Sequence, residues 1–215
     1  MKNLLFYYHK IRKEIKDKKT IIPRIEEIIH GKKITIILFE KKTHIKITDT
    51  YRFLDITTSC IKELTYLNEK KTTSNIYSLR CHRKSIDFCK EKKLSLDPIF
   101  KACKTIEDLP LFFAHADLNL NNISADGTIY DWDSSGYLPA GYDLACVITE
   151  SEVYKGNEII DFIKTNHNEK YSIYEFTLSC LFLSFALTSS KKVNEKIYLY
   201  SILNNFLTDS PKIST

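Results

Sequence analysis

The sequence predicts an α+β protein with a small β-containing part at residues 1–50 and a larger, mainly helical part at residues 51–215. Runs of β-branched residues with strand-like patterns gather before residue 50, whereas apolar residues at spacings of three and four recur after it. The chain has 215 residues, 43% hydrophobic and 27% charged, which is the balance of a folded domain that can bury a core.

The N-terminal part is predicted to contain one helix and two strands. Apolar residues at spacings of four, three and four predict a helix over residues 4–18, and Pro23 ends that pattern. Residues 33–40 are rich in β-branched side chains, and residues 43–48 alternate between polar and apolar. Both segments are predicted strands, joined by a turn at residues 40–42.

The helical part is predicted from apolar positions that share one helix face. These positions are Ile61, Leu64 and Leu67 in a first helix, Ile76 and Leu79 in the same or a following helix, and Ile99, Cys103 and Ile106 in another. Polar residues 70–75 are a predicted loop, and the apolar run 110–114 is a predicted strand. A helix is predicted at residues 172–188, and its most apolar segment, residues 176–187, predicts a buried core helix despite a few serines and threonines. A last helix is predicted at residues 193–207, with Val193, Ile197, Tyr200 and Leu203 along one side.

Residues 113–146 carry the pattern that points to chemistry. His115 precedes Asp117 by two positions, and Asn122 follows Asp117 by five. This H-x-D-x-x-x-x-N spacing is that of a kinase catalytic loop. Asp131 follows in an apolar run.

An Asp-Gly pair inside this segment predicts a β-hairpin. Asp126-Gly127 favours a two-residue type I′ loop, because both central residues of that turn need positive φ. Counting outward from this loop places Asn122 opposite Asp131, with Cβ atoms about 4.5–5.5 Å apart. An amide oxygen and a carboxylate are ligands that Mg²⁺ accepts, so these two residues are candidate metal ligands. Asp117 is then placed to accept the proton of an attacking hydroxyl.

Three ordered motifs resemble the catalytic core of the aminoglycoside phosphotransferase and choline kinase family, which has a protein-kinase-like fold. The H-G-D-x-x-x-x-N motif of that family corresponds to residues 115–122, its I-D-W-D/E stretch to residues 130–133, and its G-x-P-x-x-x-D-L segment to residues 136–144. The resemblance covers about 35 residues closely and the two C-terminal helices loosely.

The resemblance implies ATP- and Mg²⁺-dependent transfer of a phosphoryl group to a hydroxyl of a small molecule, such as an aminoglycoside, an amino alcohol like choline, or a sugar. It implies that Asp117 is the catalytic base and that Asn122 and Asp131 bind magnesium. It also implies that Asp143 is a buried brace for the catalytic loop and that His115 is structural. Asp133 is a further candidate for the metal or its surroundings, with an exposed position as the alternative.

The sequence departs from the family at its N-terminal side. Ala116 replaces the usual glycine, and the five glycines are never clustered into a glycine-rich loop. In one register, which the Ile-Pro junction after the first helix favours, residues 1–50 are a reduced N-lobe with the nucleotide hinge and without a phosphate-binding lysine. In the other, Lys46 is that lysine and Glu63 its ion-pair partner. A catalytically inactive kinase-like binding or scaffolding module is therefore the alternative function.

Charge and cysteine usage exclude several other classes. The net charge of +5 and pI of about 8.7 suit an anionic ligand such as a nucleotide but are too weak to indicate nucleic-acid binding. Six scattered cysteines without a C-x-x-C pair are typical of a reduced, cytoplasmic protein. The most apolar stretch, at residues 176–187, is far shorter than the ~20 residues of a membrane span. Neither a G-x-S-x-G nor a G-x-G-x-x-G motif is present, which argues against a hydrolase or a dinucleotide site.

Overall fold

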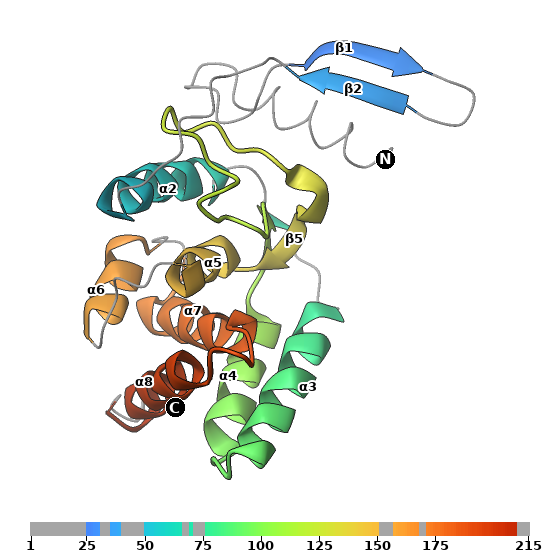
Figure 1. Cartoon of the computed structure of the whole chain (residues 1–215). Coiled ribbons are helices and arrows are strands. Elements are labelled where there is room, and N and C mark those ends of the chain that lie inside the picture. Colours follow the sequence, from blue (N-terminus) through green and yellow to red (C-terminus); the bar gives the residue numbers. More distant parts are fainter. Residues whose placement is uncertain are drawn as a thin grey trace.

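The computed structural model describes residues 25–30, 35–39, 50–65, 69–70, 76–150, 157–167 and 171–209. Within these ranges the fold is mixed α+β and mostly helical, with seven α-helices and small antiparallel sheets (Figure 1). The elements are β1 (Ile25–His30), β2 (Thr35–Phe39), α2 (Thr50–Thr65), β3 (Glu69–Lys70), α3 (Ile76–Glu91), α4 (Asp97–Asp108), β4 (Leu111–Ala114), the 3-10 helix η1 (Trp132–Ser134), β5 (Gly136–Pro139), α5 (Tyr142–Glu150), α6 (Asn157–Thr165), α7 (Ile173–Leu187) and α8 (Val193–Asp209).

The N-terminal sheet consists of β1 and β2, which pair antiparallel with Ile28 opposite Ile37. β2 confirms the strand predicted at residues 33–40, and β1 begins shortly after Pro23, where the first register expects a strand. The predicted helix at residues 4–18, the predicted strand at residues 43–48, and Lys46 lie outside the described residues.

A second sheet, with strand order β3-β4-β5, positions the segment that carries the motifs. β4 pairs antiparallel with both neighbours, and Ala114 at its end lies opposite Gly136 at the start of β5. The strand predicted at residues 110–114 is therefore confirmed as β4. Leu111, Phe112 and Ala114 are buried, as expected for a short apolar strand that α2 contacts.

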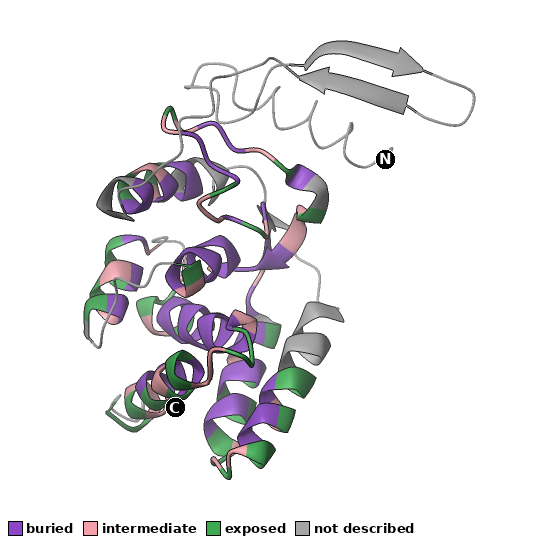
Figure 2. Cartoon of the chain, in the orientation of Figure 1, coloured by how far each residue is buried: buried purple, intermediate pink, exposed green. Residues whose placement is uncertain are grey.

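Helix α7 is the centre of the helical part. It contacts α3, α4, α5, α6 and α8, and Figure 2 shows buried residues along most of α7 and α5. A mostly apolar helix segment is stable only when other elements surround it, which is why residues 176–187 are predicted to lie in the core. That prediction is confirmed. None of the helices in the described part of the chain is both long and apolar enough to cross a bilayer.

Helix α4 also follows the sequence pattern. Ile99, Cys103 and Ile106 are all buried on one face, as predicted. Its start has a clear local cause, because Pro98 lies in the first turn, where a missing N–H costs nothing, and Ser95 Oγ accepts the N–H of Asp97 at 3.2 Å.

The other helical predictions are tested only in part. Ile61 of α2 is buried, whereas the side chains of Glu63, Leu64, Ile76 and Leu79, together with Leu67, lie outside the described residues. Five cysteines in the described ranges, at positions 60, 89, 103, 146 and 180, are buried and not joined by disulfides.

The buried face predicted for α8 is wrong in part. Ile197 is 37% exposed, whereas its neighbour Lys196 is only 3% exposed. Lys196 Nζ donates to the main-chain carbonyls of Phe185 and Thr188, each at 2.7 Å, at the C-terminal end of α7. The ammonium group therefore satisfies carbonyls that the end of a helix leaves without intrahelical partners, and this rotates the face that α8 presents to the core.

Candidate functional site

The site begins where β4 ends, and Asp143 holds the main chain there. Asp143 lies in the first turn of α5 and is buried, and its Oδ2 and Oδ1 accept the main-chain N–H groups of His115 at 2.9 Å and of Ala116 at 2.8 Å. Burial raises the pKa of the Asp143 carboxyl, and this effect outweighs the stabilisation of the carboxylate by the two main-chain N–H groups. One side chain thus fixes the entry to the loop.

Ala116 adopts a backbone conformation that is more typical of glycine. Its φ is 73°, in the left-handed region that disfavours residues with a Cβ atom. Cys146 of α5 donates its S–H to the Ala116 carbonyl at 3.6 Å, so α5 contacts this residue at both its N–H and its C=O. The alanine is held in this conformation by contacts on both sides.

His115 links the loop to the segment before η1. The ring is fully buried, packs edge-on against Trp132 at 4.8 Å between centroids, and has its Nε2 2.7 Å from the carbonyl of Tyr130. Its Nδ1 accepts the main-chain N–H of Asp117 at 3.3 Å. These partners correspond to a neutral imidazole protonated on Nε2. Both ring nitrogens are therefore engaged within the protein and are not available to a ligand.

Asp117 and Asn122, the first two residues of the predicted site, lie together. Asn122 is buried and its Nδ2 donates to Asp117 Oδ2 at 2.9 Å and to the Asp117 carbonyl at 2.8 Å. Asp117 itself is exposed. The carboxylate is therefore oriented from the protein side and open on the solvent side, which is what a general base needs.

The hairpin that follows has a three-residue loop, so the predicted two-residue loop is wrong. Ile123 pairs with Ile129, and the N–H of Tyr130 donates to the Asn122 carbonyl at 2.8 Å. Gly127 occupies the left-handed region at φ 81°, as in a type I turn followed by a bulge. The Asp126 carboxylate bonds the Ser124 hydroxyl and, at 3.0 Å, the N–H of Thr128, and these side-chain contacts favour the longer loop.

The shorter register would place Asp131 opposite Asn122, but the structure places Tyr130 there and Asp131 one position beyond. Asp131 is exposed, has a φ of 55°, and precedes η1. Amide and carboxylate oxygens match the preference of Mg²⁺, and a pair of protein ligands is usual for a metal that also binds substrate phosphates. In the described ranges no three His, Cys, Asp or Glu residues lie together as a metal site, and the Asp133 side chain lies outside those ranges.

A second amide, which the sequence motif does not include, lies at the site. Asn119 Nδ2 donates to Asp117 Oδ1 at 3.1 Å, on the opposite carboxylate oxygen from Asn122. The signal in the sequence was an Asn two residues after an Asp, a spacing at which side chains readily bond across a turn. Glu63 and Lys46, the candidates of the second register, remain predictions.

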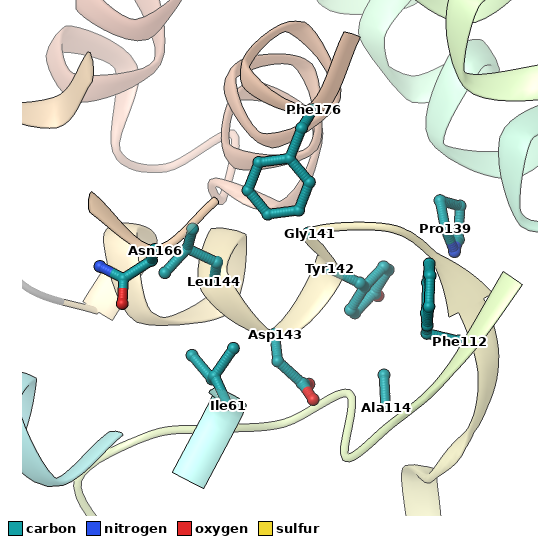
Figure 3. Close-up of a pocket in the computed structure, with 10 residues that line it drawn as sticks. All are labelled: Ile61, Phe112, Ala114, Pro139, Gly141, Tyr142, Asp143, Leu144, Asn166 and Phe176. Atoms are coloured by element: carbon teal, nitrogen blue, oxygen red, sulfur yellow. The ribbon is translucent and has the colours of Figure 1, made fainter. Parts of the chain in front are cut away.

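Behind Asp143 lies a cavity of about 30 Å³, lined mainly by apolar side chains. Figure 3 shows the Asp143 side chain reaching from α5 toward the segment that follows Ala114, with Phe176 of α7 on the opposite side of the cavity. A space of this volume holds about one water molecule, so it cannot take a nucleotide or an acceptor. The Asp117 side chain is instead accessible from the exposed side of the loop. No protein-family model and no curated protein matches this chain.

Proposed function

We propose that this protein is a phosphotransferase of the protein-kinase-like type, which moves the γ-phosphoryl group of ATP to a hydroxyl of a small molecule. The observation that carries the proposal is the loop at residues 115–122. Asp143 braces its main chain, and Asn122 orients the exposed carboxylate of Asp117. An exposed, oriented carboxylate on a braced loop suits proton acceptance from a hydroxyl.

In the proposed reaction the acceptor hydroxyl oxygen forms a bond to the γ-phosphorus, and the bond from that phosphorus to the bridging oxygen of ADP breaks. The hydroxyl proton passes to Asp117, and ADP leaves with the electron pair of the broken bond. The contribution of the protein is positioning of the hydroxyl and stabilisation of charge. Asp117 returns its proton to solvent, to which its exposed side chain has direct access.

Asn122 Oδ1 and the carboxylate of Asp131 are the ligands proposed for magnesium. The Nδ2 of Asn122 is already engaged by Asp117, which turns the amide oxygen away from that carboxylate. When bound, the metal would supply charge neutralisation for the phosphates. The remaining ligands are proposed to be phosphate oxygens and water, as is usual for Mg²⁺ bound with a nucleotide.

The acceptor is proposed to be an aminoglycoside, an amino alcohol such as choline, or a sugar. The test is magnesium-dependent release of ADP across a panel of these acceptors, followed by mass analysis of the product. Asp117→Asn keeps the shape of the side chain but removes the base, and we expect a loss of about 10²- to 10⁴-fold in kcat. Asp161→Asn, an exposed change of the same kind on α6, is the matched control and should retain activity. Undiminished transfer by Asp117→Asn would refute the assigned base.

A catalytically inactive binding or scaffolding module is the second candidate. It is favoured by the five dispersed glycines, which form no glycine-rich loop for a nucleotide phosphate. A thermal-shift titration separates the two functions. An enzyme should be stabilised by ATP with magnesium, and Asp131→Ala should lose that shift, whereas a module that binds no nucleotide should show no shift in either protein.

A further inference from the structure

We propose that Asn119 is a positioning residue that fixes the plane of the Asp117 carboxylate. This inference rests on the proposed function, because it assigns a role to Asn119 in the same reaction. It adds a second oriented donor to the site that the sequence pattern of His115, Asp117 and Asn122 did not include.

The orientation of the Asn119 amide follows from its neighbours. The main-chain N–H of Asn121 donates to Asn119 Oδ1 at 2.9 Å, so that end of the amide must be the oxygen. The other end is then the NH₂ group, and it donates to Asp117 Oδ1 at 3.1 Å and lies 3.3 Å from the Asp117 carbonyl oxygen. In a flipped amide, the NH₂ group would face the N–H of Asn121 and the oxygen would face the Asp117 carboxylate, so neither hydrogen bond could form.

Two hydrogen-bond donors restrict rotation of the Asp117 carboxylate, whereas one donor does not. Rotation about the last bond of an aspartate side chain has broad, shallow minima, so a single donor on one oxygen leaves the carboxylate free to swing. Asn122 holds Oδ2 at 2.9 Å and Asn119 holds Oδ1 at 3.1 Å, so both ends of the group are fixed. Each oxygen keeps a further lone pair, and these lone pairs are the ones that can accept the proton of an acceptor hydroxyl.

Exposure makes this support necessary. Asp117 is exposed, so packing does not restrict its side chain, whereas Asn122 is buried and Asn119 half-buried. Orientation of a reacting group contributes to rate only when it is maintained until the transition state. Asn119 therefore affects the rate of the chemical step rather than the binding of either substrate.

Asn119→Asp is the discriminating change. An aspartate keeps an oxygen that can accept the N–H of Asn121, so the local turn is retained, but it replaces the NH₂ donor with an oxygen facing the Asp117 carboxylate. Asn121→Asp is the matched control, because it adds the same charge on the same loop at an exposed position. Asn119→Ala removes the donor without adding charge. It therefore separates the loss of carboxylate orientation from charge repulsion between two carboxylates.

The kinetic test uses the full chain, ATP and the best acceptor of the panel. We expect Asn119→Asp and Asn119→Ala to lower kcat by about 10- to 100-fold, with KM for ATP and for the acceptor within about twofold and melting temperatures close to that of the parent. Asn121→Asp should keep kcat within about twofold. Equal kcat values for the Asn119 variants and Asn121→Asp, or a loss confined to KM, would overturn the inference.

A spectroscopic test separates this inference from the proposed function. The side-chain NH₂ signals of Asn119 and Asn121 can be followed by ¹⁵N correlation spectra in the parent and in Asp117→Asn. The Asn119 signal should shift because its acceptor changes, whereas that of Asn121 should stay. If no acceptor supports transfer but the Asn119 signal shifts, the proposed function fails and the pairing stands. If the Asn119 signal does not respond, the pairing is refuted whatever the activity.

Discussion

The main-chain N–H of Ala116 donates to Oδ1 of Asp143 at 2.8 Å, although Ala116 has a φ of 73° that alanine rarely adopts. The bond compensates for backbone strain at the residue before Asp117. A buried acid on one helix thus determines the conformation of a loop 27 positions earlier in the chain.

Asp143→Asn should lower the free energy of unfolding by about 1–3 kcal/mol. The amide offers one acceptor oxygen where the carboxylate offers two, so either His115 or Ala116 loses the partner of its N–H. Urea unfolding measures the change. Asp87→Asn, an exposed substitution on α3, should stay within about 0.5 kcal/mol, and similar losses in both variants would contradict this role of Asp143.

Ala116→Gly should leave the protein as stable or up to about 1.5 kcal/mol more stable. Relief of left-handed strain, about 1–2 kcal/mol, opposes the entropy cost of glycine, about 0.5–1 kcal/mol. Ala102→Gly in the buried part of α4 should instead destabilise by about 1 kcal/mol or more. Thermal melts of the two variants measure whether their stability changes have opposite signs. A similar loss of stability at both sites would argue against strain at Ala116.

Gly141→Ala should destabilise the protein by about 3 kcal/mol or more, through both strain and overpacking. Gly141 has a φ of 85°, and a Cβ atom there would lie 2.3 Å from Cys180 Sγ in α7. The double variant with Cys180→Ala removes the clash but not the strain, so it should be more stable than the sum of the single changes predicts. A double-mutant cycle by chemical denaturation measures this coupling, and strictly additive effects would contradict the close approach.

Lys196→Met should cost about 3 kcal/mol, since it leaves the carbonyls of Phe185 and Thr188 without the donor at 2.7 Å. The flexible, apolar methionine fills a similar volume, so the loss reports the hydrogen bonds more than the packing. Lys191→Met, an exposed change in the same connection, is the control. Equal melting temperatures for the two variants would show that the buried ammonium does not stabilise the end of α7.

The free energy of unfolding should fall as pH rises above about 9. Burial raises the pKa of the Cys89 thiol from 9.0 to about 11, although Lys196 partly opposes the shift. A thiol with a raised pKa in the folded state stabilises the fold below pH 9, and this contribution is lost as pH rises through the folded value. Burial also raises the pKa of Cys146, with Asp143 and Asp117 adding to the effect. Urea unfolding at a series of pH values should show a shallower decline for Cys89→Ala than for the parent.

The sequence was sufficient for elements whose burial follows from one local pattern. The predominantly apolar run at residues 176–187 of α7 has one stable solution, a core helix. The spacing of Ile99, Cys103 and Ile106 in α4 likewise favours a helix with one buried face. The mixed α+β class was predictable because strand-like and helix-like patterns occupy separate parts of the chain. The contact between Asp117 and Asn122 was predictable because the two residues are five positions apart.

Competition between side chains and main chain accounts for what the sequence did not reveal. Ser124 and Asp126 bond within the hairpin loop and lengthen it by one residue, which moves Asp131 out of register with Asn122. In α8 the spacing of apolar residues favoured burial of Ile197, but carbonyls at the end of a different helix attract Lys196. The residue pattern of one helix or strand contains no information about hydrogen-bond partners on another element.

The central place of α7 has a consequence for the order in which the molecule matures. The helix α5, which carries Asp143, packs on α7, and α7 follows the loop at residues 115–122 in the chain. On the ribosome Asp117 is therefore synthesised well before α7, the helix on which α5 packs. The loop at residues 115–122 can therefore reach its final conformation only after the C-terminal helices have been synthesised and have packed against α5.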